Sequence, residues 1–408
     1  MLISSDGEPL SNFIMWQDTR NRDIAHSLKP HDEYVFRNSG ARINTVFTAT
    51  KIAWFKQNAP DIYAKAAKAL IVPDYLVYLL TGEFATDYTY GSRTHLMNIN
   101  TLKWDGELCR LFGVDMEKLC ELRPQGSITG YVTENFARIT GMKSGVPVIS
   151  AGGDQQCGAL GLGVLDANDM EVNCGTGSFV ISVRESPALD NPNVICNVAA
   201  IPGMYIVESN IISCASALDW LIREYFPEYV NDGKIDFDAV NAEASHTPAG
   251  AGGLYCVPHF QGCGTRDWNP DARAAFWGFS LSSKRRDMIR SLYEGIACEI
   301  AKSVDALGGD EGAKSVYIAG GLCKSDPFVG ILSCALGRPL CRYDNIQATA
   351  TGAFISAAVA TWLYGDYEEA SLAVHADAGG MIQPDLKAHG FYREYMKATE
   401  KVYEGMKG

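Results

Sequence analysis

The sequence predicts an α/β protein, because helical and extended patterns alternate along its 408 residues. Two short apolar runs, residues 146–150 and 316–319, each lead into a pair of glycines, as buried strands of α/β sheets do. Hydrophobic residues make up 47% of the chain, which is ordinary for a globular protein. The length favours two to three domains. We place the joint in residues 161–169, which predicts domains over residues 1–165 and 166–408.

Helices dominate the prediction for the first part of the chain. Residues 50–57 and 62–70 read as helices around a break at Pro60. Pro73 suits the first turn of another helix, and Gly82 suits its end. This region therefore supplies the helical layer of the first domain.

The second part begins with a predicted strand pair. Residues 170–183 read as two strands joined at residues 175–177. Residues 284–307 form a long amphipathic helical pattern, and the strand at 316–319 leads to a helix that begins near Ser325. These elements again alternate, as the α/β class requires.

The charge balance narrows the class of partner. The chain has 35 Lys and Arg against 48 Asp and Glu, a net charge of −13, which argues against nucleic acid or an anionic membrane as the main partner. The longest uncharged stretch, residues 346–365, contains hydroxyl and amide side chains, so it favours a helix buried in protein. The 12 cysteines form no Cys-x-x-Cys, the 7 histidines form no metal motif, and no export signal follows Met1. We therefore expect reduced thiols and a cytoplasmic location.

The most informative segment is Ala-Gly-Gly-Asp-Gln-Gln at residues 151–156. Asp154 follows a predicted strand, so its carboxylate stands at a strand's carboxyl end, where open α/β sheets bind ligands. One interpretation is that Asp154 caps the following helix. The other is that it accepts the proton of a substrate hydroxyl, which a weak base does best when a metal assists phosphoryl transfer.

Two further turns carry small residues that suit phosphate binding. At residues 175–177, Gly-Thr-Gly lets backbone N–H groups approach phosphate oxygens, and Thr176 adds a hydroxyl. Gly320 and Gly321 let a nucleotide lie against the backbone, near the helix that begins around Ser325. Each turn alone also fits an ordinary hairpin or loop. The order and spacing of the three segments together favour a phosphate site.

These segments resemble the FGGY family of carbohydrate kinases, which includes relatives of the glycerol and xylulose kinases, over nearly the whole chain. The matching segments are Trp16-Gln-Asp-Thr-Arg20, Thr86-Asp-Tyr88-Thr-Tyr-Gly-Ser92-Arg-Thr94, Asn98-Ile-Asn-Thr101, Gly153-Asp-Gln-Gln156, Gly175-Thr-Gly177, Pro258-His-Phe-Gln-Gly262, Trp268-Asn-Pro-Asp-Ala-Arg273 and Gly320-Gly321. The resemblance implies an actin-like (ribonuclease H-like) fold, in which two domains close over ATP and sugar.

The resemblance also implies roles. The reaction would be phosphorylation of a polyol or sugar hydroxyl by ATP with Mg²⁺, and both glycerol and xylulose are compatible. Asp154 would be the base and would face the metal. The other site residues group by ligand: Trp16, Tyr88, Gln155 and Phe179 for the substrate, Gly175, Thr176 and Gly177 for phosphates, and Gly320, Gly321 and Ser325 for the adenine side. Taken singly, Trp16 and Phe179 also fit core aromatics, and Tyr88 fits a strand aromatic.

The front of the chain departs from the family pattern. Family members open with Asp-x-Gly-Thr-Thr, which supplies a metal-linked Asp and the first phosphate loop, whereas this chain begins Met1-Leu-Ile3. The first domain would then be N-terminally truncated, with an unpaired sheet edge and exposed apolar surface unless another chain or a second copy covers them. Two alternatives to an active carbohydrate kinase stay open. One is a non-catalytic remnant that binds sugar or a partner chain, and the other is an actin-like assembly protein. Smaller departures at Arg266, Asn269, Ala274 and Gln347 read as divergence.

Overall fold

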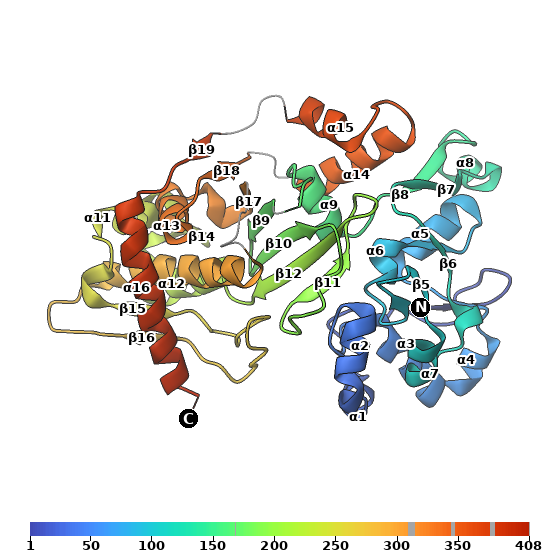
Figure 1. The fold of residues 1–408 in the computed structure, drawn as a ribbon, viewed down its shortest axis with the longest axis horizontal. Helices are drawn as coiled ribbons and strands as arrows, with labels where there is room; N and C mark the ends of the chain where they lie inside the picture. Colours follow the sequence, from blue (N-terminus) through green and yellow to red (C-terminus); the bar gives the residue numbers. More distant parts are fainter. Residues whose placement is uncertain (168, 309–314, 344–346, 376–379, 408) are drawn as a thin grey trace. The chain divides into compact units, whose positions relative to one another are not determined.

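The computed structural model describes residues 1–167, 169–308, 315–343, 347–375 and 380–407 (Figure 1). Its contacts divide the chain into two compact units. The first contains Met1–Leu165, Arg184–Ile206 and Gln347–His375, and the second contains Asp166–Val183, Val207–Ile346 and Ala376–Gly408. Neither unit is continuous in sequence. The division into domains over residues 1–165 and 166–408 stays a prediction.

The first unit is mainly helical. Its helices are α1 (Arg22–Ser27), α2 (Asp32–Ser39), α3 (Thr48–Asn58), α4 (Pro60–Lys65), α5 (Val72–Thr81), α6 (Tyr88–Gly91), α7 (Gly106–Phe112), α8 (Glu134–Thr140), α9 (Asp154–Gly161), α14 (Ala348–Ala360) and α15 (Tyr367–Val374). Its strands are β1 (Leu2–Ile3), β2 (Lys68–Ala69), β3 (Ala85–Asp87), β4 (Met97–Asn98), β5 (Lys103–Trp104), β6 (Glu121–Arg123), β7 (Ser127–Tyr131), β8 (Pro147–Ser150) and β11 (Ile195–Val198). They pair as β1–β2, β3–β6, β4–β5 and β7–β8.

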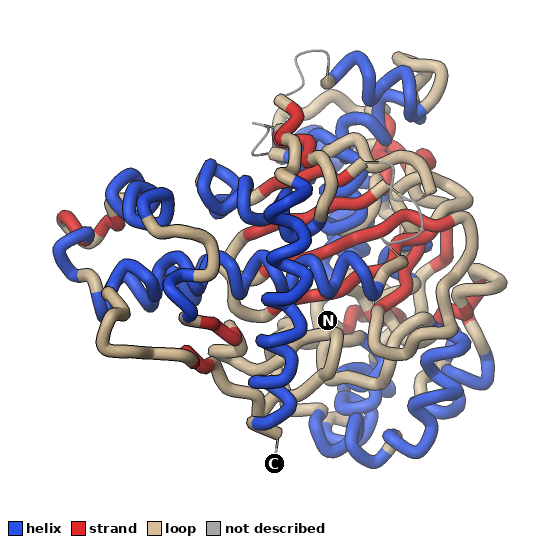
Figure 2. Tube along the Cα trace, turned by 60° about the vertical axis from the view of Figure 1, so that its left-hand side comes forward, coloured by secondary structure: helices blue, strands red, loops and turns tan. Residues whose placement is uncertain are grey.

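The second unit is built on a larger sheet, whose strands are among the red segments in Figure 2. Its strands run in the order β12-β10-β9-β17-β18-β19, and β17 lies parallel to both β9 and β18. The strands of the second unit are β9 (Met170–Cys174), β10 (Ser178–Arg184), β12 (Tyr205–Ile211), β13 (Val230–Asn231), β14 (Lys234–Ile235), β15 (Tyr255–Val257), β16 (Ala275–Trp277), β17 (Val316–Ala319), β18 (Leu340–Arg342) and β19 (Met381–Ile382). Of these, β13 pairs with β14 and β15 pairs with β16, outside the larger sheet. The helices are α10 (Ala215–Tyr225), α11 (Phe237–His246), α12 (Arg285–Ala306), α13 (Asp326–Leu336) and α16 (Leu386–Gly405). The long helix α12 packs against α11, α13 and α16.

Local sequence signals correctly predict several elements. Pro73 lies in the first turn of α5, and Gly82 ends that helix in the left-handed conformation that glycine adopts without strain. The hairpin β9–β10 and the helix α12 also lie where the sequence places them. Ser325 caps α13, as a helix beginning near it requires.

The helix predicted over residues 62–70 is too long. The helix α4 ends at Lys65, and Lys68–Ala69 forms the strand β2 instead. This strand pairs antiparallel with Leu2–Ile3, far away in the sequence. A long-range pairing therefore overrides the local helical pattern.

The strand β8 is less buried than its sequence predicts. All four of its residues are half-buried, and within the described part of the chain β8 pairs only with β7. On α5, which packs against this hairpin, Val72, Leu76 and Leu79 are exposed to 48%, 53% and 41%. The predicted burial of residues 146–150 is therefore wrong, whereas the unpaired sheet edge and the exposed apolar surface stay predictions.

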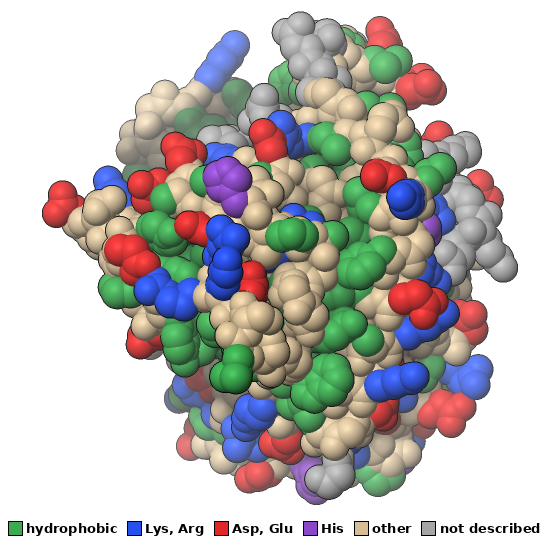
Figure 3. All heavy atoms as spheres, turned by 90° about the vertical axis from the view of Figure 1, so that its left-hand side faces the viewer, with side chains coloured by type: hydrophobic (Ala, Val, Ile, Leu, Met, Phe, Trp, Pro, Cys, Tyr) green, Lys and Arg blue, Asp and Glu red, His purple; other side chains and the backbone are tan. Residues whose placement is uncertain are grey.

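The uncharged stretch at 346–365 contains α14, which packs against α9 in the first unit. Gly352 of α14 lies so close to α9 that an added Cβ would meet the Cys157 carbonyl oxygen at 1.9 Å. Ile346 lies outside the described residues. Among the helices described, none combines the length and the apolar character that crossing a bilayer needs. On the face drawn in Figure 3, acidic and basic side chains are interspersed.

Candidate active site

Asp154 stands at the start of α9, directly after β8 and two glycines. Gly153 occupies the helix cap position, so Asp154 is the first helical residue and not the cap. Its side chain is exposed, and Oδ1 accepts a 2.9 Å hydrogen bond from the N–H of Gln155. Among the described residues, Oδ2 accepts no hydrogen bond. The carboxylate therefore has an oxygen available to a ligand or a proton.

The backbone before Asp154 is held by the buried carboxylate of Asp87. The Ser150 hydroxyl at the end of β8 donates to Asp87, and so does the hydroxyl of Thr89, at 2.5 Å. Thr89 in turn accepts a 3.0 Å hydrogen bond from the N–H of Gly153. Burial raises the pKa of Asp87, and the hydrogen bonds from Ser150 and Thr89 oppose that rise. Asp87 therefore organises the loop from inside the protein.

Tyr90 connects this loop to a pocket in the first unit. Its hydroxyl donates a 3.1 Å hydrogen bond to the carbonyl oxygen of Gly152, and burial raises the pKa of that hydroxyl. The pocket has a volume of about 330 Å³ and a mostly apolar lining that includes Trp16, Tyr90 and Lys51. Trp16 is 59% exposed, so its ring is accessible to a small molecule. Tyr88 and Gln155 do not line this pocket.

Lys51 and Tyr90 were not anticipated from the sequence. Lys51 Nζ donates a 2.9 Å hydrogen bond to the Asp18 carbonyl oxygen, inside the Trp16–Arg20 segment. Burial lowers the pKa of Lys51. Tyr90 lies two residues after Tyr88, within the matching segment Thr86–Thr94. That segment could therefore have pointed to Tyr90 as a site residue. Lys51 lies in an unremarkable helical pattern and carries no such signal.

In the second unit, the two glycine turns follow the same ends of two neighbouring strands. Strands β9 and β17 are parallel, with Ala319 opposite Asn173, and each strand then leads directly into its turn. An added Cβ on Gly320 would lie 2.4 Å from the carbonyl oxygen of Cys174, so only glycine permits this approach. Thr176, Gly320 and Gly321 are all exposed. The turns therefore share one edge of the sheet, where ligands of α/β proteins bind.

The Gly175–Gly177 turn is fastened to the start of α10. The Thr176 carbonyl oxygen accepts hydrogen bonds of 3.0 Å from the Cys214 N–H and 2.9 Å from the Ser216 hydroxyl. An added Cβ on Gly177 would meet the Ile211 carbonyl oxygen at 2.7 Å. The turn is thus rigidly framed, and its exposed side is available to a ligand.

The remaining predicted residues of the second unit lie beside these turns. Phe179 is half-buried on β10, opposite Asn173 of β9. Ser325 is buried, and its hydroxyl donates a 2.6 Å hydrogen bond to Asn241 and accepts one of 3.3 Å from the N–H of Phe328. Ser325 therefore already has two partners in the protein.

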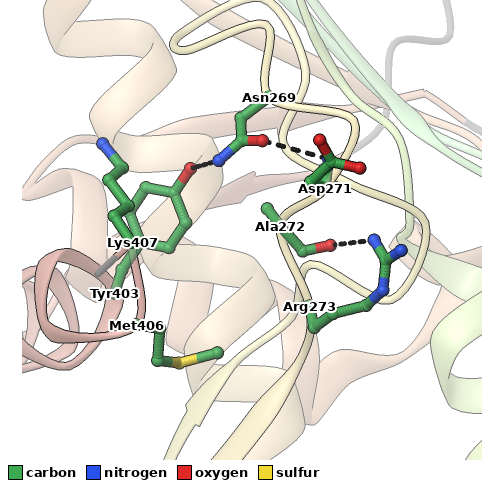
Figure 4. A pocket seen from close by; sticks show the side chains of 7 residues that line it. All are labelled: Asn269, Asp271, Ala272, Arg273, Tyr403, Met406 and Lys407. Carbon is green, nitrogen blue, oxygen red and sulfur yellow. Dashed lines mark hydrogen bonds between the residues drawn. The ribbon is translucent and has the colours of Figure 1, made fainter.

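A second pocket of about 330 Å³ lies where the segment after Trp268 meets the end of α16 (Figure 4). Its lining consists of Asn269, Asp271, Ala272, Arg273, Tyr403, Met406 and Lys407. The Arg273 guanidinium donates to the Ala272 carbonyl oxygen at 2.8 Å, and the Asn269 amide donates to the Tyr403 hydroxyl at 3.3 Å. These bonds hold the segment in place, and the pocket contains none of the predicted site residues.

The predicted residues fall into two groups by unit. Trp16, Tyr88, Asp154 and Gln155 belong to the first unit, whereas Gly175, Thr176, Gly177, Phe179, Gly320, Gly321 and Ser325 belong to the second. Within the first unit, Tyr90 joins the Trp16 pocket to the Asp154 loop. Within the second, the two turns lie at one sheet edge. Their assignment to substrate, phosphate and adenine stays a prediction.

Two parts of the chain match the domains of a known protein family. Residues 1–161 match the N-terminal domain of the FGGY family of carbohydrate kinases, and residues 170–361 match its C-terminal domain. A glycerol kinase of Rippkaea orientalis is 30% identical over 378 residues, which cover 89% of this chain and 73% of the relative. A glycerol kinase of Mycoplasmoides gallisepticum is also 30% identical, over 91% of this chain and 74% of the relative.

Solved structures agree on the fold. A xylulose kinase from Rhodospirillum rubrum, 24% identical, superimposes with a TM-score of 0.91 over 99% of this chain and 82% of the other. The fold is thus the two-domain actin-like fold of the sugar kinases. Together, the two family matches extend over most of the chain, and we conclude that it belongs to the FGGY family of carbohydrate kinases, which are phosphotransferases.

Proposed function

We propose that this chain transfers the γ-phosphoryl group of ATP to a hydroxyl group of a polyol or sugar, and that Asp154 accepts the proton of that hydroxyl. Family membership and the relatives named glycerol kinase and xylulose kinase support the reaction class. The observation that carries the role of Asp154 is its exposed carboxylate, on a loop held by Thr89 and Tyr90. Its Oδ2 accepts no hydrogen bond from the residues that the structure describes.

The loop geometry suits a proton acceptor. As the acceptor oxygen bonds to phosphorus, its proton passes to the Asp154 carboxylate, and ADP leaves with the electrons of the broken bond. A base held by a rigid loop needs little reorganisation during this step. We assign the exposed ring of Trp16 to the carbon skeleton of the substrate and the amide of Gln155 to one of its hydroxyls. Tyr88 and Phe179 remain proposed substrate contacts.

The nucleotide is assigned to the second unit. Backbone N–H groups of residues 175–177 and of Gly320 and Gly321 would bind phosphate oxygens, with the Thr176 hydroxyl as a further donor and Ser325 on the adenine side. Support comes from the exposure of Thr176, Gly320 and Gly321 at one sheet edge.

Mg²⁺ fits the residues present. The described residues contain no group of three or more His, Cys, Asp or Glu side chains arranged to hold a metal ion. Mg²⁺ in kinases needs no such cage, because one or two carboxylates suffice beside waters and substrate phosphates. The exposed carboxylate of Asp154 meets that need. When bound there, the ion would neutralise phosphate charge.

Substitution of Asp154 by Asn tests the proposal. Asp154→Asn keeps the size of the side chain but cannot accept a proton, so kcat should fall about 10²- to 10⁴-fold. Binding of glycerol or xylulose, measured by calorimetry, should change little. The matched control is Asp61→Asn, an exposed carboxylate in the first turn of α4 in the same unit. Equal turnover in wild type and Asp154→Asn would refute the role of Asp154.

The half-buried strand β8 and the exposed apolar residues of α5 favour a second candidate. It is a non-catalytic chain that binds sugar, or a partner chain or second copy, at this surface. Calorimetry and a coupled ADP assay on the same preparation separate the two. Sugar binding without ATP binding or ADP release would establish the second candidate, and sugar-dependent ADP release would exclude it. Sedimentation of the same sample tests self-association.

A further inference from the structure

The pocket beside Trp16 in the first unit contains a nearly buried cation. Its volume of about 330 Å³ lies in the range of ligand pockets, and its lining is mostly apolar. Of the described side chains that line it, Lys51 alone is charged. Lys51 is only 7% exposed. Because burial of a charge is costly unless a partner compensates it, the partners of Lys51 decide what the pocket can bind.

The protein itself compensates this cation only in part. Lys51 Nζ donates a 2.9 Å hydrogen bond to the Asp18 carbonyl oxygen, and within the described part of the chain it has no other acceptor and no salt bridge. The Asp18 carboxylate instead accepts hydrogen bonds from Arg20, from Nε at 3.0 Å and from Nη2 at 2.7 Å. An ammonium group has three donors, so two donors of Lys51 remain for a ligand.

Lys51 keeps its charge at neutral pH. Burial lowers its pKa below the ordinary value of 10.5, whereas the negative charge of Asp18 raises it. A lysine is neutral at pH 7 only when its pKa falls by more than about three pH units, and Asp18 opposes such a fall. The pocket therefore presents an ammonium group in apolar surroundings, where an ion pair is stronger than in water.

Three further side chains of the lining suit a hydroxylated carbon chain. Thr48 lies three residues before Lys51 in α3, so its hydroxyl and the ammonium group share one helix face. The ring of Trp16 is 59% exposed and offers an apolar surface to C–H groups. Tyr90 donates its own proton to the Gly152 carbonyl oxygen, so its oxygen can accept a proton from a ligand hydroxyl. The pocket thus combines a site for a negative group with sites for hydroxyls.

We propose that this pocket binds a polyhydroxy acid, with its carboxylate on Lys51 and its hydroxylated chain beside Trp16 and Tyr90. The inference rests on the proposed function and narrows its substrate class from polyols and sugars in general to sugar acids. A carboxylate fits because its oxygens can accept the two remaining N–H groups of Lys51. The hydroxyl that receives the phosphoryl group would lie toward Tyr90, since Tyr90 also holds the loop before Asp154.

Calorimetry with gluconate and sorbitol tests the substrate class. The two compounds have carbon chains of equal length, and gluconate carries a carboxylate where sorbitol carries a hydroxymethyl group. Because only gluconate can form an ion pair with Lys51, it should bind the wild type at least about tenfold more tightly than sorbitol. Equal affinities, tighter binding of sorbitol, or no binding of gluconate overturns the inference.

Substitution of Lys51 assigns the preference to its residue. Lys51→Met removes the charge, so gluconate should bind about ten- to a hundredfold more weakly, whereas the affinity for sorbitol should stay the same. The matched control is Lys65→Met, an exposed lysine at the end of α4 in the same unit, which should bind both ligands as the wild type does. A Lys51→Met variant that still prefers gluconate overturns the inference. If this variant does not fold by circular dichroism, Lys51→Gln replaces it, because an amide can still donate to the Asp18 carbonyl oxygen.

A coupled ADP assay separates this inference from the proposed function. ADP release that depends on ATP and gluconate supports both. Gluconate binding that Lys51→Met abolishes, without ADP release in the wild type, supports the carboxylate site and counts against the kinase reaction. ADP release with sorbitol and none with gluconate supports the kinase reaction and overturns the assignment of a sugar acid.

Discussion

The hydroxyl of Thr89 accepts a 3.0 Å hydrogen bond from the backbone N–H of Gly153, the residue before Asp154. The same hydroxyl donates to the buried carboxylate of Asp87 at 2.5 Å. Gly152 adopts a φ of 125°, and an added Cβ there would meet Thr89 Cγ2 at 3.2 Å. A side chain 64 residues away in the chain thus sets the course of the loop before Asp154.

Removal of the Thr89 hydroxyl should affect turnover more than binding. Thr89→Val keeps the shape of the side chain but leaves the buried Gly153 N–H without its acceptor. We expect the free energy of unfolding to fall by about 1–3 kcal/mol and kcat to fall about tenfold with little change in KM. Thr89→Ser retains the hydroxyl and should restore most of the turnover. A Val variant with full kcat would mean that the loop needs no support from Thr89.

Glu171 should make the protein less stable in alkali. This β9 carboxylate is fully buried, and burial raises its pKa to about 8, an effect that Asn173 only partly offsets. Neither oxygen makes a hydrogen bond of good geometry among the described residues. Between its ordinary pKa of 4.5 and about 8, the folded chain holds a proton that the unfolded chain has lost. Stability therefore falls as the pH rises through this window, by up to about 1.4 kcal/mol per pH unit.

Glu171→Gln should remove this dependence. Urea unfolding at pH 9 should find the variant more stable than wild type by about 2–4 kcal/mol, and the difference should vanish near pH 4.5. Glu224→Gln, an exposed position on α10, should follow the wild-type curve. Parallel curves for wild type and Glu171→Gln would show that the carboxylate is ionised without penalty.

Glu299 anchors the segment after Val257 through buried charges. Burial alone would raise its pKa, but the ammonium of Lys302 at 2.8 Å and the guanidinium of Arg266 at 3.5 Å hold it at about 2. Glu299→Gln leaves these cations with one carboxylate fewer and should cost about 3 kcal/mol of stability at pH 7. The lowered pKa stabilises the fold in full above the ordinary value of 4.5 and loses this effect as the pH falls to about 2, so the difference should shrink over that range.

Chemical unfolding across this pH range measures the Glu299 effect. The exposed pair Glu394–Lys397 provides the control, and Glu394→Gln should unfold with the wild type. Loss of the same stability in both variants would show that burial of the pair does not matter.

Ser325 links stability to the proposed nucleotide turn. Ser325→Ala removes the cap of α13 and the bond to Asn241, which should lower the free energy of unfolding by about 1 kcal/mol. The loosened turn should also bind ADP several-fold more weakly by calorimetry. Ser325→Thr retains a hydroxyl and should restore both properties. Wild-type ADP affinity in the Ala variant would remove Ser325 from the proposed site.

Predictions from consecutive residues were reliable where the signal was local. The limits of α5, the β9–β10 hairpin and the start of α13 follow from Pro73, Gly82, the Gly-Thr-Gly turn and Ser325. Membership of the family was also predicted from short segments, because Gly153–Gln156 and the two glycine turns are motifs of only a few consecutive residues each. Backbone preferences and turn chemistry act over one or two turns of chain, so such signals can be read directly.

Contacts between distant segments required the fold. The strand at Lys68–Ala69 exists because Leu2–Ile3 pairs with it, and the half-burial of β8 is set by β7, α5 and α14, which pack against it. The support of the loop before Asp154 by Thr89 and Tyr90 likewise joins residues far apart in sequence. Which buried polar groups find partners is settled by packing in three dimensions, since the cost of leaving them unpaired depends on everything around them.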